Sequence, residues 1–250
     1  MSPIVQALVA TTGTWLLTAI GTLPVLFFRS APRRVMDAIM GAAAGIMVAA
    51  SCWSLLVPAI ELGGTFPAVA GLLLGGAFLY SADQLLPHLH PEFPDEAQAE
   101  GPHTQWRRSA LLMLAITLHN FPEGLAVGVS FGGGDESAAT ALAIGIGLQN
   151  IPEGLAIALP LRRGGMNRWR ALWYGQLSAA VEPVAGVLGA ALVLAARPVL
   201  PYAMAFAAGA MLYVVVEELI PETVRSGTTD VATVGFLSGF TIMMALDTAF

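Results

Sequence analysis

The sequence LHNFPEGLAVGV at residues 118–129 recurs almost unchanged as LQNIPEGLAIAL at residues 148–159. Each copy stands within an apolar stretch of the length that crosses a membrane as a helix, about 20 residues. Consecutive spans run in opposite directions, so the two copies are expected to meet antiparallel near the middle of the bilayer. Inverted repeats with Pro- or Gly-interrupted helices are typical of the binding sites of transporters.

The composition extends this interpretation to the whole chain. Of the 250 residues, 56% are apolar and 11% charged, and the mean hydropathy is +0.72, whereas about a quarter of a soluble domain is charged. The chain has no lysine and a formal net charge of −6, which argues against a nucleic-acid partner because such partners require basic patches. A single cysteine, Cys52, excludes a disulfide framework and a thiolate zinc finger. We therefore expect an all-α polytopic membrane protein in a lipid bilayer.

Hydropathy predicts eight transmembrane helices within a single domain, residues 1–250. The spans are expected at about 4–28, 36–60, 66–86, 109–131, 138–161, 171–194, 199–221 and 231–250. We interpret the first as a retained helix because no basic region precedes it and no cleavage site follows closely. The one long connection, 87–108, is rich in proline and acidic residues and contains three histidines, His88, His90 and His103. They are candidates for weak metal binding or for a merely solvated loop.

The arginines predict the orientation, because cytoplasmic loops collect positive charge. With the amino terminus outside, ten of the eleven arginines fall in cytoplasmic loops and only Arg197 falls outside. Both termini are therefore expected to be extracytoplasmic, and the 87–108 loop cytoplasmic.

Acidic rather than basic side chains lie in the predicted membrane interior. Glu123, Glu153 and Glu182 belong to segments whose polar groups stand roughly 16–20 Å from the nearest helix-end arginine, in a hydrocarbon core about 30 Å thick. A charge at that depth costs about 3 kcal/mol even on lenient scales. We therefore expect protons or a metal cation to neutralise these carboxylates.

The spacing of the polar residues places them on one face of each repeated helix. His119 and Asn120 precede Glu123 by four and three residues, and residues at these spacings are neighbours on a helix surface. The second copy repeats this geometry with Gln149, Asn150 and Glu153. Pro122 and Pro152 cannot donate a backbone hydrogen bond and are expected to kink their helices.

One imidazole, three carboxylates and several amides form a site of mixed chemical hardness. Imidazole suits zinc, iron, copper or nickel, whereas carboxylate and amide oxygens also admit manganese and cadmium. Because no thiolate is present, tight structural zinc binding is not expected. Moderate affinity suits an ion that must also leave.

At these residues the chain resembles the ZIP family of divalent metal transporters, specifically the bacterial GufA-like branch, whose second motif begins with Gln instead of His. The resemblance covers nearly the whole length. It implies uptake of zinc, and also iron, manganese or cadmium, across the bacterial cytoplasmic (inner) membrane. It further implies that four spans (one, four, five and six) move against the other four.

The resemblance also implies individual ligands. One ion would be held by His119, Glu123, Gln149 and Glu153, with Met47 of span two as a soft ligand. A second ion would be held by Asn120, Asn150 and Glu182 together with Glu123 and Glu153, forming a binuclear centre. Further pathway candidates are Glu61, Glu217, Glu218 and Asp247. The chain departs from the family at Asn150, where this branch often has Asp, and at Glu217, where relatives commonly have His.

Alternative interpretations remain open at this point. An intramembrane enzyme is disfavoured because the chain has no HExxH or GxSxG motif. The alternative function is an intramembrane metal or proton sensor without net metal flux. Glu182 could be a protonated structural residue and Met47 a packing residue. Carrier or channel, proton coupling, one ion or two, and a homodimer are also undecided.

Overall fold

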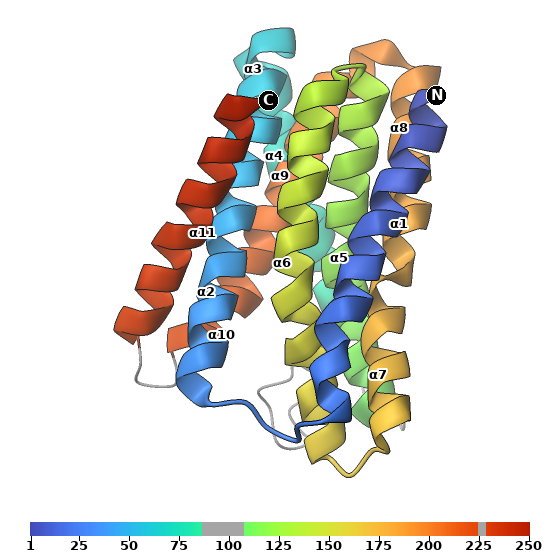
Figure 1. Cartoon of the computed structure of the whole chain (residues 1–250). Coiled ribbons are helices and arrows are strands. Elements are labelled where there is room, and N and C mark those ends of the chain that lie inside the picture. Colours follow the sequence, from blue (N-terminus) through green and yellow to red (C-terminus); the bar gives the residue numbers. More distant parts are fainter. Residues whose placement is uncertain (87–107, 225–228) are drawn as a thin grey trace.

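The computed structural model describes residues 1–86, 108–224 and 229–250, and within these ranges the regular structure is helical throughout (Figure 1). Residues 87–107 of the predicted connection 87–108, with His88, His90 and His103, lie outside the described residues, as does Arg225; Arg108 begins a helix. Seven helical runs are long and apolar enough to cross a membrane. The polytopic all-α class is thereby confirmed.

The helical runs fall at the predicted spans. The first is α1 (Pro3–Thr22) with the 3₁₀ turn η1 (Leu23–Leu26). The second contains α2 (Arg33–Ala49), the π-helical η2 (Ala50–Leu56) and α3 (Val57–Gly63). Then follow α4 (Thr65–Leu85), α5 (Arg108–Gly133) and α6 (Glu136–Arg163). The sixth contains α7 (Arg168–Leu177), η4 (Ser178–Ala180) and α8 (Val181–Ala195). The seventh contains η5 (Arg197–Val199), α9 (Leu200–Val214), the π-helical η6 (Val215–Leu219) and α10 (Ile220–Val224), and α11 (Thr229–Ala249) is last.

Helix α5 stands at the remaining predicted span, 109–131, and is 26 residues long. It is not among the seven runs found apolar enough over the described residues. A total of eight spans therefore stays a prediction.

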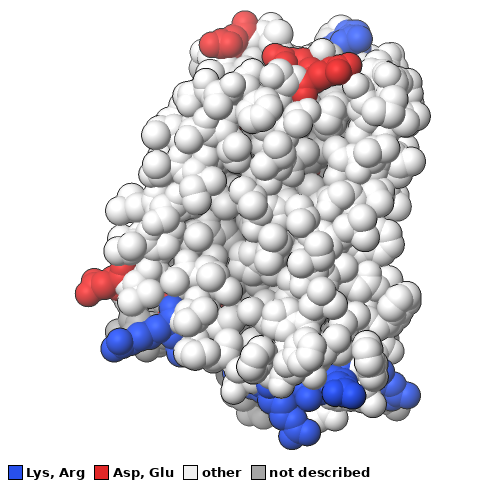
Figure 2. Space-filling view, viewed as in Figure 1, with Lys and Arg blue, Asp and Glu red and all other residues white. Residues whose placement is uncertain are grey.

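The outer surface matches a hydrocarbon environment. On the face drawn in Figure 2 the charged side chains lie toward the two ends, arginines mostly at one of them, and the lateral surface between the ends is uncharged. Large apolar side chains such as Leu73 on α4 and Val234 on α11 are 66% and 65% exposed. Both termini lie at the end opposite the arginine-rich end (Figure 1).

The helices form two groups by their closest packing. In the first group, α5 packs on α8 and α1 on α6, joined by α7. In the second group, α2 packs on α11 and α4 on α9, joined by α3 and α10. Small residues let helix backbones touch in membranes. A Cβ on Gly128 would overlap the Gly186 carbonyl within the first group, and one on Gly45 would overlap the Phe236 carbonyl within the second.

Between the two groups, the described glycines meet side chains. The main contacts join α2 to α6 and α5 to α9. The Met243 sulfur of α11, for example, fills the space beside Gly145 of α6. Among the glycines that the structure describes, those that meet a neighbouring helix backbone do so within one group.

A tight turn between α5 and α6 brings the two copies of the repeat side by side. Gly134 has φ +99°, a conformation that glycine adopts readily. Asp135 then caps α6 by accepting hydrogen bonds from the backbone N–H groups of Ser137 and Ala138, both at 3.1 Å. Both helices continue through Pro122 and Pro152, so the expected kinks stay predictions.

Candidate metal centre

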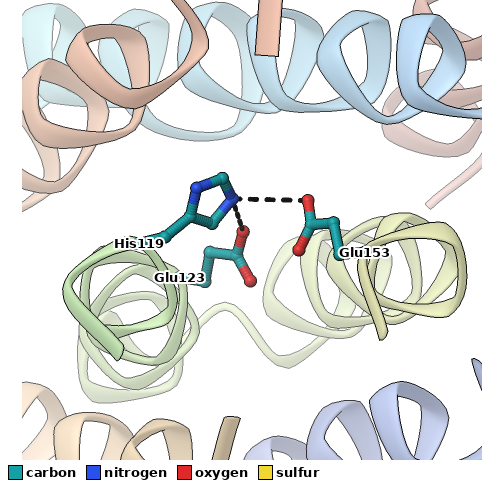
Figure 3. A group of neighbouring side chains, drawn as sticks. All are labelled: His119, Glu123 and Glu153. Carbon is teal, nitrogen blue, oxygen red and sulfur yellow. Dashed lines mark ion pairs between the residues drawn. The ribbon is translucent and has the colours of Figure 1, made fainter. Parts of the chain in front are cut away.

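Three of the predicted site residues converge between α5 and α6. The His119 Nε2 atom lies 3.5 Å from Glu123 Oε1 and 3.4 Å from Glu153 Oε1. One ligand atom from each residue lies within 4.8 Å of the others, and all three side chains are buried. Figure 3 shows the imidazole edge directed at both carboxylates, one from its own helix and one from the neighbour. Of the His, Cys, Asp and Glu side chains that the structure describes, these three alone form such a group.

The antiparallel register of the hairpin explains this convergence. Gln149 Nε2 donates a hydrogen bond of 2.7 Å to Glu123 Oε1. His119 precedes Glu123 by four residues on α5, and Glu153 follows Gln149 by four residues on α6. His119 and Glu153 are also in contact with each other. Because four residues make about one helical turn, the two pairs are successive contacts of one helix interface.

Several buried oxygens of the cluster lack a hydrogen-bond partner among the described residues. They are Glu123 Oε2, both Glu153 carboxylate oxygens, Gln149 Oε1 and Asn150 Oδ1. Buried polar atoms are nearly always paired in native proteins. A group of unpaired acceptors around one imidazole is therefore suited to a cation.

Glu182 of α8 is held by two other helices. Its Oε1 accepts a hydrogen bond of 2.9 Å from Asn150 Nδ2, and its Oε2 accepts one from the Thr14 hydroxyl of α1. Asn150 Nδ2 also donates to the Thr14 carbonyl at 3.2 Å. The Thr14 backbone carbonyl can only accept, which fixes the Asn150 amide with Nδ2 toward Thr14 and Glu182 and leaves Oδ1 facing elsewhere.

The glycines of the repeat position the helices that carry these partners. Gly124 follows Glu123, and a Cβ there would stand 2.6 Å from the Cα of Glu182. Gly154 follows Glu153 in the same way, and a Cβ there would overlap the Thr18 carbonyl of α1. The glycine in each copy of the repeat therefore allows one more helix to pack closely: α8 against α5 and α1 against α6.

The second helix group contributes Glu218. Its Oε2 lies 3.5 Å from His119 Nδ1, the ring nitrogen that faces away from Glu123 and Glu153. Glu218 belongs to the π-helical turn η6, and such turns are frequent at functional sites. Its neighbour Glu217 is exposed.

The other predicted residues lie in varied surroundings. Asn120 is buried, and its Nδ2 has no hydrogen-bond partner among the described residues. Met47 is fully buried on α2, which packs against α6. Asp247 accepts hydrogen bonds from the Ser54 hydroxyl at 2.8 and 3.0 Å, and Glu61 is exposed near the end of α3.

Sequence analysis did not single out α1 as a part of the site. Besides Thr14, it contributes Trp15, whose indole N–H donates to the backbone and side-chain oxygens of Gln176, both at 2.9 Å. A signal was present: four threonines at helical spacing, all buried, mark one face of α1. They are Thr11, Thr14, Thr18 and Thr22.

Comparison with known proteins gives a consistent picture. Residues 95–247 match the family model described as ZIP Zinc transporter. The chain is 43% identical to the human zinc transporter ZIP11, over 98% of this chain and 97% of that protein. It is 40% identical to the zinc transporter GufA of Myxococcus xanthus, over 92% and 93% of the two chains. It is also 40% identical to the zinc transporter ZIPB of Bordetella bronchiseptica, over 93% of this chain and 77% of that one.

Proposed function

The chain belongs to the ZIP zinc transporter family, and from this premise we propose that it carries zinc across the membrane through His119, Glu123 and Glu153. The family consists of transporters, so the chain is not an enzyme. One observation carries the proposal: a buried imidazole faces two carboxylates whose remaining oxygens have no partner among the described residues.

The charge balance favours a cationic substrate. The cluster brings two carboxylates together, and the arginines seen in Figure 2 lie at the ends of the molecule. Burying an unpaired charge is costly unless a counter-charge arrives. A divalent ion supplies that counter-charge, and the imidazole and carboxylates suit zinc.

The first ion is proposed to bind His119 Nε2, Glu123 and Glu153. The side-chain amide oxygen of Gln149 and the Met47 sulfur are proposed as its further ligands. The Gln149 amide nitrogen already holds Glu123, which leaves its oxygen for the ion. Iron, manganese and cadmium are proposed as further substrates because the oxygen ligands admit them.

A second ion is proposed at Asn120, Asn150 and Glu182, bridged by Glu123 and Glu153. The unpartnered Asn150 Oδ1 supports this site. The hydrogen bonds from Asn150 and Thr14 oppose it, because they satisfy Glu182 within the protein. The zinc stoichiometry of the purified chain, one or two per protomer, decides between the two arrangements.

The pathway is proposed to run from the end that carries the termini to the arginine-rich end. Asp247 and Glu61 would receive the ion from outside, and Glu218 with Glu217 would pass it toward the cytoplasm. The positive-inside rule supports the orientation assumed here, with both termini extracytoplasmic and the 87–108 loop cytoplasmic. The whole chain is proposed to be one domain in a bacterial inner membrane.

Movement of the first helix group against the second is proposed to expose the site alternately. Backbone contacts within each group and side-chain contacts between the groups support two bodies that can shift relative to each other. A carrier of this kind shows saturable flux far below that of an open pore.

The test is zinc entry into liposomes that contain the purified chain and a trapped zinc-sensitive dye. Saturable entry that is lost in Glu123→Ala and Glu153→Ala, with both variants folded and inserted, supports the proposal. Binding of zinc without entry, under an imposed proton gradient as well as without one, would establish the sensor function instead.

A further inference from the structure

A lateral groove of about 500 Å³ separates the two helix groups on the side of α1 and α2. It is lined by α1, η1 and α6 of the first group and by α2 and α11 of the second. Three residues at its rim, Ile20, Leu148 and Ile242, are 51%, 40% and 47% exposed, so the groove is open to the outside. Its lining is apolar except for Gln149, the residue that holds Glu123.

Hydrocarbon is the occupant that this lining suits. The groove lies within membrane-spanning runs, where the surrounding medium is lipid. A water molecule in a cavity needs two to four polar partners, and the lining offers one polar side chain. An acyl chain from the bilayer needs none.

The arginine-rich end of the groove carries positive charge. Residues 27–32 link η1 to α2 and therefore cross from the first group to the second at the end opposite the termini (Figure 1). Both of the elements that they link line the groove. Arg29 in this link and Arg34 in the first turn of α2 are both exposed. Pro24 and Ile39, which line the groove, stand five residues from them along the chain.

Arg33 has a different, internal role. Its Nε lies 2.9 Å from Asp37 Oδ1, and its guanidinium donates to the Glu222 carbonyl at 2.6 Å. This side chain therefore ties α2 to α10. Arg29 and Arg34 are the other two arginines in the chain segment 24–39, whose ends, Pro24 and Ile39, line the groove.

We propose that this groove binds a phospholipid with an acidic headgroup, its acyl chain between the two helix groups and its phosphate against Arg29 and Arg34. Basic pockets between transmembrane helices are known to bind acidic lipid headgroups. The role of this lipid rests on the proposed function: it would cover the side of the metal centre on which Gln149 lies and separate it from the rest of the bilayer. It would also occupy the boundary across which the two groups move.

The test is retention of lipid by the purified chain, measured by native mass spectrometry after exchange into mixed phosphatidylglycerol and phosphatidylcholine. We expect one tightly held phosphatidylglycerol. Arg29→Gln/Arg34→Gln should weaken its retention on the order of tenfold, and Arg168→Gln/Arg170→Gln, at the same end on α7, should leave it unchanged. Ala42→Phe should fill the groove and displace the lipid, whereas Ala70→Phe, an equally half-buried site on α4, should not.

Three outcomes would overturn the proposal: equal loss in both arginine pairs, unchanged retention in Ala42→Phe, or a second copy of the chain cross-linked through the groove rim. The experiment uses no zinc, so its failure is distinct from failure of the transport proposal. An unchanged thermal unfolding midpoint of the variants, measured without zinc, shows that they are folded.

Discussion

Gly124 of α5 lies directly against the backbone of Glu182 on α8, so close that a Cβ at residue 124 would stand 2.6 Å from the Glu182 Cα. The glycine of the first Pro-Glu-Gly therefore determines how near α8 comes to the centre. Gly154 has the equivalent place against α1. The repeat specifies both ligands and the spacing of the helices behind them.

Gly124→Ala should displace α8 and disturb the centre. Overpacking of this kind typically costs about 1–3 kcal/mol, and we expect lower thermal stability with loss of zinc entry. The matched control is Gly13→Ala, because a Cβ there meets nothing within 4 Å, and in a helix alanine is favoured over glycine by about 1 kcal/mol. Thermal unfolding and liposome flux measure both variants; equal behaviour of the two would refute the role given to Gly124.

Glu153→Ala should abolish or sharply reduce zinc entry while the chain still folds and inserts. The change removes a carboxylate whose two oxygens have no hydrogen-bond partner among the described residues, so no internal hydrogen bond is lost; the ion-pair contact with His119 at 3.4 Å is removed. Glu136→Ala, at the exposed start of α6, is the control. Wild-type flux in a well-folded Glu153→Ala chain would exclude this residue from the path.

Asn150→Asp should tighten zinc binding and slow its release. The substitution removes the donor that lies 2.9 Å from Glu182 Oε1 and places a second carboxylate there. Without metal the two like charges repel each other, so the apo chain should be less stable and should regain stability on adding zinc. Titration calorimetry and thermal unfolding with and without zinc test this, and weaker zinc binding would contradict it.

Glu218→Gln should lower zinc affinity through His119. Its carboxylate lies 3.5 Å from His119 Nδ1, and partners of a metal-binding histidine typically contribute about 10–100-fold to affinity or activity. Glu217→Gln, at the exposed neighbouring position, should bind zinc as the wild type does. Equal affinities in calorimetry would show that Glu218 does not orient the imidazole.

The spans and the central residues could be predicted because their signals are local. Apolar length determines a membrane span, and the spacing of His119 and Glu123 determines a helix face. The same spacing in the second copy indicated Glu153. Each of these features can be read from consecutive residues.

The partners from other helices could not be predicted in this way. The contact of Glu218 with His119 depends on the π-helical turn η6, whose period differs from the 3.6 residues on which helix patterns rest. Thr14 reaches Glu182 across 168 positions of sequence. The buried threonine face of α1 indicated a polar neighbour but not which one.

The adjacent amides of α6 point to two different partners: Gln149 holds Glu123 of α5, whereas Asn150 holds Glu182 of α8. Successive residues on a helix are about 100° apart around its axis. The two side chains therefore extend from the same helix in two different directions. A small rotation of α6 about its own axis would move both amides away from their glutamate partners at the same time. Glu123 and Glu182 would then lose their amide hydrogen-bond donors at the same time, so that rotation of a single helix would change the environment of both carboxylates together.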